Sequence, residues 1–496
     1  MNKSKHPHHL KEYSHILIAA GIGLTILLGL APNNGLTREG VMLLAIVAPT
    51  IYMWLFVNTH WVSLLFLALL VITGIMSPNQ VWAGSLGHFS IMLVLTFSII
   101  SECLRENGVI EKMANWFITR KFVQGRPYAF IGMYFASNLI IGIFMQNLAL
   151  AVIFVALTIQ ICQRLGIKKG DSLYTCLMLG TFWGNVVLSI SSPIAKSLPN
   201  ILIGLVYANF GIQITYAQWL MVGMPFKVGM FVIIMLCIRI ANPNTDALRN
   251  LDVLKIQQHE QPLSISGRVA LCAMVGLILF ILLPEIFLMF NLFIGISTYL
   301  VQLGVIVPAI ITLVALSIIR VKDREKGEWV PVMEFAQVAK KIPINLLLFV
   351  SVVVIMGIPL SAEETGIIPW MQHLLSPLTG GLSPFLLLSS LLIIAVIITN
   401  FISTTVVITV FVSLGVAIFS NHSVVSYAIN PVMYSVLVAF AAGITALTPA
   451  ATITAPIFYG PNHIKVKEVM RINLLFITLA SVVLFAMIPL VMAVIN

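Results

Sequence analysis

Two polar clusters interrupt long apolar runs at corresponding places in the chain. The first is Ile143-Phe144-Met145-Gln146-Asn147-Leu148, and the second, 257 positions later, is Thr399-Asn400-Phe401-Ile402-Ser403-Thr404-Thr405. Gln146 thereby aligns with Ser403, and Asn147 aligns with Thr404. These side chains are neutral hydrogen-bond donors and acceptors, which suits the binding of a small polar or charged ligand.

Each cluster lies midway along a run too long for one membrane span. The runs extend from Arg126 to Gln163 and from Pro384 to Ser420, and the second contains no Lys, Arg, Asp or Glu. About 20 apolar residues cross a bilayer as a helix. We therefore predict two re-entrant hairpins, 126–163 and 384–420, each with a polar cluster at its tip.

A second pair of features repeats at an offset of 256. Leu188-Ser189-Ile190-Ser191-Ser192-Pro193 aligns with Ile444-Thr445-Ala446-Leu447-Thr448-Pro449. Proline breaks a helix, and broken backbone at membrane depth is tolerated only inside protein or beside a water-filled cavity. We expect the two tips and the two broken helices to converge near the membrane midplane.

Such a site has two chemical properties. Helix N-termini present unpaired N–H groups and a positive dipole end to an anion, and exposed carbonyl oxygens can hold a small cation. Ser, Thr and Asn in membrane helices also bond across helices without any other role. Matched clusters in both halves nevertheless favour the binding site of a secondary transporter.

The composition sets the fold class. Of 496 residues, 59% are hydrophobic and 9% are charged, with a mean hydropathy of +1.05, which predicts an all-α polytopic membrane protein. We predict about eleven transmembrane helices in addition to the hairpins, at 15–32, 40–57, 61–76, 88–105, 173–195 continuing into 200–210, 219–240, 268–291, 296–319, 342–360, 429–450 and 471–495. The first is expected to be retained, because no small-residue cleavage site follows it.

The predicted domain organisation has two inverted repeats. The segments are a tail and first helix (1–39), a first repeat (40–240), a linker (241–267) and a second repeat (268–496). The loop 105–126 holds five Lys or Arg residues, whereas its counterpart 362–383 has none. By the positive-inside rule, the two hairpins open to opposite faces of the plasma membrane, with the N-terminus cytoplasmic and the C-terminus extracytoplasmic.

Net charge and cysteine spacing argue against a nucleic-acid-binding protein and against a cysteine metal site. The net charge of +10 comes from basic residues in short loops, where they face anionic lipid, so no nucleic-acid partner is expected. The five cysteines share no metal-type spacing.

Both halves resemble the divalent anion/sodium symporter family of the ion transporter superfamily. The similarity covers roughly 40–496 and is clearest at Thr399–Thr405 and Ala446-Leu447-Thr448-Pro449. It implies a homodimer that moves a dicarboxylate, tricarboxylate or sulfate by an elevator motion of the hairpin-bearing domain. No organic cofactor is expected, and sodium is the ion that the resemblance implies.

The resemblance also implies the site residues. Carried over position by position, the substrate-binding residues are Gln146, Asn147, Ser192, Pro193, Ser403, Thr404, Thr405, Thr448 and Pro449. The sodium sites, formed mainly by backbone atoms, involve Asn147, Ser191, Thr399, Ile402, Thr404 and Leu447. This chain departs from the family's pattern at Gln146, Leu148, Ser191, Ser192 and Thr404, which leaves open the number of sodium ions and the preference for a dicarboxylate.

Lys196 is a further candidate for substrate binding. It lies three residues after Pro193, within the predicted broken helix, and its counterpart is the neutral Thr452. A lysine at membrane depth is costly and functional by default, although its chain can also snorkel toward water. The functional interpretation is a tethered cation beside the anion.

Three alternatives differ from a sodium-coupled symporter. An anion exchanger without sodium coupling fits the same residues. A cation/proton antiporter needs an acidic residue at the site, and neither tip has one. An intramembrane enzyme needs a catalytic cluster at depth, and all ten histidines lie in the tail, loops or span ends, so we predict no enzymatic activity.

The inverted-repeat topology leads to a direct test. Single cysteines at positions 168 and 363, introduced into a cysteine-free background, should react with an impermeant reagent from opposite faces of the membrane. The reason is that Lys168 belongs to a basic loop predicted to be cytoplasmic, whereas Glu363 belongs to the loop 362–383, which has no Lys or Arg and is predicted to lie outside. Labelling of both positions from one face would contradict the inversion.

Overall fold

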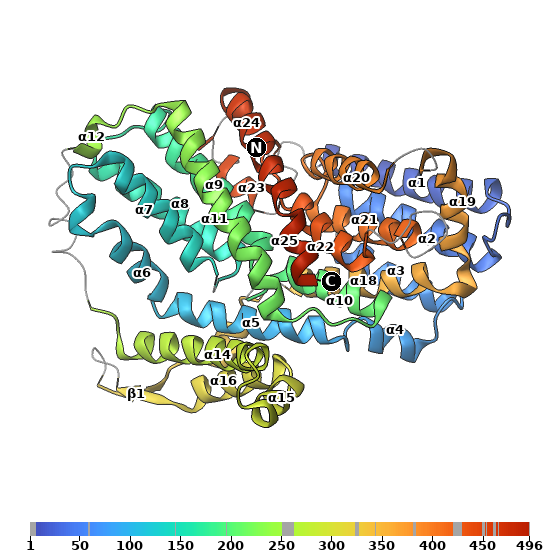
Figure 1. Ribbon diagram of the computed structural model, residues 1–496, viewed down its shortest axis with the longest axis horizontal. Helices are drawn as coiled ribbons and strands as arrows, with labels where there is room; N and C mark the ends of the chain where they lie inside the picture. Colours follow the sequence, from blue (N-terminus) through green and yellow to red (C-terminus); the bar gives the residue numbers. More distant parts are fainter. Residues whose placement is uncertain are drawn as a thin grey trace.

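A computed structural model shows an all-α protein (Figure 1). It describes residues 6–57, 60–143, 145–194, 196–249, 262–322, 327–342, 344–379, 383–419, 429–448, 452, 454–459, 463–464 and 466–495.

The first half contains α1 (His6–Gly29), α2 (Arg38–Phe56), α3 (His60–Ile72), α4 (Pro78–Gly84), α5 (Phe89–Glu106), α6 (Val109–Ile118), η1 (Lys121–Val123), α7 (Pro127–Ile141), α8 (Asn147–Arg164), α9 (Ser172–Ser191), α10 (Ser197–Phe210), α11 (Tyr216–Ala241) and α12 (Asp246–Arg249).

The second half contains α14 (Ile265–Met289), α15 (Ile294–Gln302), α16 (Ile306–Ile318), β1 (Arg320–Lys322), β2 (Trp329–Pro331), α17 (Phe335–Ala339), α18 (Ile344–Ser361), η2 (Glu363–Thr365), α19 (Ile367–Thr379), α20 (Pro384–Thr399), α21 (Thr404–Phe419), α22 (Pro431–Ala442), α23 (Ala455–Tyr459), α24 (Val466–Ala486) and α25 (Ile488–Ile495). The two short strands pair antiparallel, with Val321 opposite Val330.

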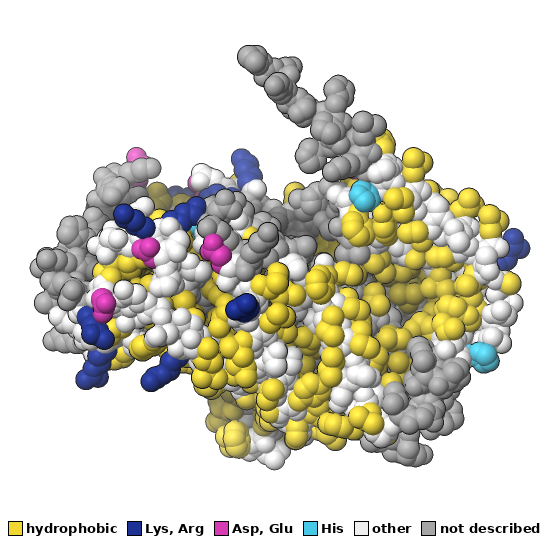
Figure 2. Space-filling view, turned by 90° about the horizontal axis from the view of Figure 1, so that it is seen from above, with side chains coloured by type: hydrophobic (Ala, Val, Ile, Leu, Met, Phe, Trp, Pro, Cys, Tyr) yellow, Lys and Arg dark blue, Asp and Glu magenta, His cyan; other side chains and the backbone are white. Residues whose placement is uncertain are grey.

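The helices have the length and composition of membrane spans. Six of those described are long and apolar enough to cross a bilayer alone, and the pair α15 and α16 forms a seventh candidate. Figure 2 shows hydrophobic side chains over most of one face, with Lys, Arg, Asp and Glu gathered mainly at its left end. The predicted all-α polytopic membrane fold is therefore confirmed.

Three predicted spans differ from the helices observed. The span 296–319 is two helices, α15 and α16, bent by 77°, because the turn between them includes Gly304 at a φ of +68°. The last span, 471–495, is divided into α24 and α25. The span 429–450 ends as a helix at Ala442, well before Pro449.

The two halves repeat the same order of elements. The helices that begin at Phe89, Val109, Pro127, Asn147 and Ser172 correspond to those that begin at Ile344, Ile367, Pro384, Thr404 and Pro431, at separations of 255 to 259 residues. The glycines that precede α6 and α19, Gly108 and Gly366, both have positive φ angles, of 66° and 63°. The periodicity inferred from the polar clusters thus extends to the helices around them.

Both predicted hairpins form and turn at their polar clusters. α7 ends at Ile141 and α8 begins at Asn147, while α20 ends at Thr399 and α21 begins at Thr404. α7, α20 and α21 have 15, 16 and 16 residues, or about 22–24 Å at 1.5 Å per residue. A hydrocarbon core of about 30 Å is thicker than that, as a re-entrant hairpin requires; α8 is longer, with 18 residues.

The two helix breaks, which follow α9 at Ser191 and α22 at Ala442, pack directly against one another. A Cβ atom at Gly443, just after α22, would lie 2.8 Å from Cγ2 of Ile190, near the end of α9. Trp219 of α11 donates its indole N–H to the Ile190 carbonyl over 2.9 Å and stacks on Phe440 of α22. The backbone of α11 also touches the first break, since a Cβ at Gly223 would lie 2.0 Å from the Ser191 carbonyl oxygen.

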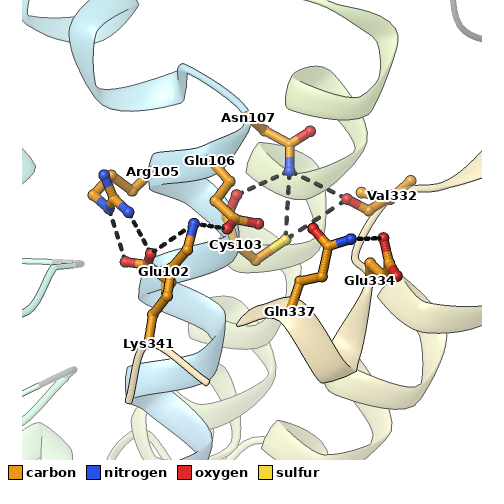
Figure 3. Close-up of polar contacts among 9 residues, drawn as sticks. All are labelled: Glu102, Cys103, Arg105, Glu106, Asn107, Val332, Glu334, Gln337 and Lys341. Carbon is orange, nitrogen blue, oxygen red and sulfur yellow. Dashed lines mark hydrogen bonds and ion pairs between the residues drawn. The ribbon is translucent and has the colours of Figure 1, made fainter. Parts of the chain in front are cut away.

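A polar cluster at the end of α5 joins the first half to the second (Figure 3). Lys341 pairs with Glu106 and lies 3.8 Å from Glu102, which also holds Arg105. The amide of Asn107 donates to the Val332 carbonyl over 3.2 Å. These contacts fix the last turn of α5 immediately before Gly108, where the chain turns into α6 and the first hairpin.

Candidate functional site

The first hairpin tip is bound by the lysine of the first broken helix. Lys196 precedes α10 as its N-cap and is only 2% exposed. Its ammonium group donates hydrogen bonds to the Met145 carbonyl oxygen and to Oδ1 of Asn147. Snorkelling does not describe this side chain, because its charge is buried against the tip.

A second contact joins the same tip to α9. Nδ2 of Asn185 donates to the Asn147 carbonyl over 2.8 Å. Gly142 packs so closely on α9 that a Cβ there would lie 2.1 Å from a methyl group of Leu188. The tip is therefore held by α9 and by the residue that begins α10.

Gln146 is directed to a different element. Its Nε2 donates to Oγ of Ser98 over 2.7 Å, and its backbone N–H donates to Oγ of Ser101 over 3.0 Å. Both serines belong to α5. Gln146 is thus bonded to a helix outside the hairpin, and its contact with a substrate stays a prediction.

The second tip is joined to its own break by Asn400. Oδ1 of Asn400 accepts from the backbone N–H groups of Ala446 and Leu447, each over 2.9 Å. Nδ2 donates to the carbonyls of Val396 and Ile444 over 2.8 and 2.9 Å. One buried amide thereby satisfies four backbone groups.

Two threonines reinforce this junction. Oγ1 of Thr448 donates to the Asn400 carbonyl over 2.6 Å, and Oγ1 of Thr399 donates to the Ala442 carbonyl over 2.8 Å. Thr399, Leu447 and Thr448, predicted from the sequence, therefore lie together with Asn400.

The other predicted residues lie at the ends of the helices. Ser192 caps α9 and accepts the Ile194 N–H over 3.3 Å, while the Pro193 carbonyl accepts from Asn200 over 2.9 Å. Thr404 and Thr405 are nearly buried in the first turn of α21, and Ile402 and Ser403 are half-buried before it. Pro449 lies outside the described residues.

The structure brings the predicted residues together in two groups. Each tip contacts the broken helix of its own half, and the breaks touch through Ile190 and Gly443. The four elements thus form one connected unit, and that this unit is a binding site at the membrane midplane stays a prediction.

The oxygen atoms of this unit suit a hard cation better than a transition metal. Within the described residues, no group of three or more His, Cys, Asp or Glu could hold a metal ion. What the tips and breaks offer is backbone carbonyl, amide and hydroxyl oxygen, the ligand type of hard cations. At the first tip, the Lys196 ammonium group occupies two of these oxygens.

Three residues of this region were missed from the sequence. Asn400 and Asn185 connect the tips to the broken helices, but neither was among the predicted site residues, although Asn400 belongs to the second polar cluster. Lys227 is buried within α11. A basic residue inside the predicted span 219–240 was the available signal.

Comparisons with known proteins agree with this geometry. A model of the citrate transporter family, CitMHS, matches residues 42–438. The sodium-dependent dicarboxylate transporter SdcS of Staphylococcus saprophyticus subsp. saprophyticus is 24% identical, over 94% of this chain and 89% of that protein. Together they confirm the resemblance to divalent anion/sodium symporters.

Asn400 should be the most sensitive residue of the second junction. Asn400→Leu keeps the volume but leaves the N–H groups of Ala446 and Leu447 unpaired, at about 1–3 kcal/mol each. We expect a clear fall in the thermal midpoint of the purified protein. Asn209→Leu is the matched control, because Asn209 bonds the Leu205 carbonyl of its own helix; equal midpoints for the two variants would contradict the assignment.

Proposed function

This chain belongs to the citrate transporter family, and from that premise we propose that it moves a small di- or tricarboxylate across the plasma membrane by secondary active transport. The proposal takes the tips and breaks as the binding site. Alternating access would come from an elevator motion of the hairpin-bearing elements.

The observation that carries this proposal is the first tip. α8 and α10 both begin there, and neither has a side-chain hydrogen bond at its N-cap, Gln146 and Lys196 respectively. Their first-turn N–H groups and positive dipole ends suit carboxylate oxygens. The buried Lys196 ammonium adds a full positive charge beside them.

The repeats differ in how they supply positive charge. SdcS is named as sodium-dependent, and tip carbonyls of the second repeat are available for such an ion. In the first repeat, Lys196 binds the Met145 carbonyl and Asn147 Oδ1, the kind of oxygen ligands that sodium would take. We infer that Lys196 replaces the sodium ion of that repeat.

This substitution favours exchange as a second candidate function. A sodium ion that binds and leaves can drive net uptake, whereas a tethered ammonium cannot leave. A transporter with one fixed cation therefore needs fewer sodium ions, or none on that side. Counter-transport of a second carboxylate would complete the cycle.

The proposed topology and oligomeric state rest on the sequence. We propose that the N-terminus is cytoplasmic and the C-terminus extracytoplasmic, that lipid surrounds the apolar surface, and that the chain forms a homodimer.

Uptake by proteoliposomes tests the function itself. Labelled citrate, succinate and sulfate should be offered with and without an inward sodium gradient, and with and without unlabelled carboxylate inside. We expect uptake of at least one carboxylate, stimulated by internal carboxylate if exchange operates. No uptake of citrate or succinate under any of the four conditions would refute the proposed substrate class, whether or not sulfate enters.

Lys196 tests the role of the fixed charge. Two unit charges about 4 Å apart interact by about 4 kcal/mol at an effective dielectric constant near 20, or roughly a thousandfold in affinity. Lys196→Thr, which copies the neutral counterpart in the second repeat, should weaken anion binding severely, and sodium should not restore it.

Lys196→Arg is the matched control, since it keeps the charge. Affinity and sodium dependence that stay unchanged in Lys196→Thr would show that Lys196 has only a structural role.

A further inference from the structure

Lys227 is a buried base that the proposed site does not use. It lies in the middle of α11, only 6% exposed, and its ammonium nitrogen has no hydrogen-bond partner among the described residues. An ammonium group at this depth is stable only beside a counter-charge or after it gives up its proton. Either way, an anion that arrives beside it stabilises the charged form.

The position of Lys227 is set by the packing of α11. Gly223, one turn earlier on the same face, lies against the Ser191 carbonyl at the first break. The neighbouring Phe226 packs edge-on against Phe440 of α22, with ring centroids 4.8 Å apart. Lys227 lies near enough to Lys196 for the two groups to repel one another when both are protonated.

Other buried polar atoms, on helices that pack with α11, are also unpaired. Seven buried side-chain polar atoms lack a hydrogen-bond partner in the described part of the chain, and five of them lie on α7, α9 and α11. These five are Nδ2 and Oδ1 of Asn138, Oδ1 of Asn185, Oγ of Ser191 and Nζ of Lys227. α9 packs against both α7 and α11. Buried polar groups of a folded protein are normally bonded, so this concentration indicates a missing partner.

Lys227 and the unpaired donors of this set suit a negatively charged partner, whereas the two amide oxygens do not contribute to its binding. Among the described residues, no Asp or Glu forms an ion pair with Lys227 or with Lys196. Glu285, which faces α11 from α14, accepts the N–H of Ala217 near the start of α11, more than two turns before Lys227. Neutral donors such as Ser191 Oγ and Asn138 Nδ2 complement an anion, and Lys227 supplies its counter-charge.

We propose that Lys227 is the centre of a second anion site, among α7, α9 and α11, that holds one small negatively charged group, a halide ion or a carboxylate. The site goes beyond the proposed function, because its central residue, Lys227, is not among the residues assigned to the tips and breaks; it borders the first break at Ser191. It holds whether or not the chain transports carboxylates. A carboxylate would come from the transported anion, and a halide from solution.

Thermal denaturation of the purified full-length chain distinguishes these sources. Midpoints are measured at constant ionic strength in potassium HEPES, whose bulky anion serves as reference, with chloride or succinate titrated in. Lys227→Met removes the charge and keeps the length, Lys227→Arg keeps the charge, and Lys340→Met, at an exposed lysine after α17, is the matched control.

A halide site predicts that chloride raises the midpoint of the wild type, Lys227→Arg and Lys340→Met by a few degrees and leaves Lys227→Met unchanged. A carboxylate site predicts no chloride effect and an apparent succinate affinity at least about tenfold weaker in Lys227→Met. In HEPES alone, Lys227→Met should match or exceed the wild-type midpoint, since it removes an uncompensated charge.

Two results would overturn the proposal: a chloride shift that persists in Lys227→Met, or the absence of a chloride shift together with equal succinate affinities. If Lys227→Met cannot be purified, Lys227→Gln replaces it under the same criteria. This denaturation experiment does not depend on transport. A chain that binds anions but does not transport carboxylates would therefore count against the proposed function alone.

Discussion

The structure depends on one constraint: backbone polar groups at membrane depth must find partners within the protein. A hairpin that turns inside the membrane, and a helix that breaks there, both expose N–H and C=O groups. Each half solves the problem by placing its hairpin tip against its broken helix. The contacts that satisfy the backbone are therefore the same contacts that build the candidate site.

The two halves satisfy this constraint with different chemistry. In the second half, an amide on the tip, Asn400, reaches four backbone groups of the tip and the break. In the first half, the equivalent of Asn400 is Ile143, and the contact comes from the opposite side, where Lys196 on the break reaches the tip. One junction is neutral and the other carries a positive charge.

The sequence predicted the features that follow from periodicity and from helix breakers. Both hairpin tips, the first break at Ser192 and the pairing of the halves were read from apolar run lengths, prolines and a constant offset. The sequence predicted a span that continues to residue 450, whereas α22 ends at Ala442, because no proline marks that end. The chain leaves the helix there at Gly443, where close packing on Ile190 leaves no room for a side chain.

The directions in which polar side chains point could not be predicted from the sequence. Gln146 and Asn147 are neighbours in one cluster, yet Gln146 turns to α5 and Asn147 to Lys196. Asn185 lies in the middle of α9, a mainly apolar helix, and only the structure shows that its amide reaches the first tip. Lys227 was different, since a lysine within a predicted span was visible from the start and its burial follows from the apolar face of α11.

The asymmetry of charge bears on how such a transporter resets. Lys196 and Lys227 both belong to the first half, so in the proposed elevator motion their positive charges would move with the elements that carry them. With an anion bound, that charge is compensated; after release, the empty protein would carry an unpaired charge across the membrane, which is costly. A returning anion removes this cost, whereas a sodium ion does not. A fixed cation in one repeat therefore opposes the return of the empty carrier and favours the exchange of one anion for another.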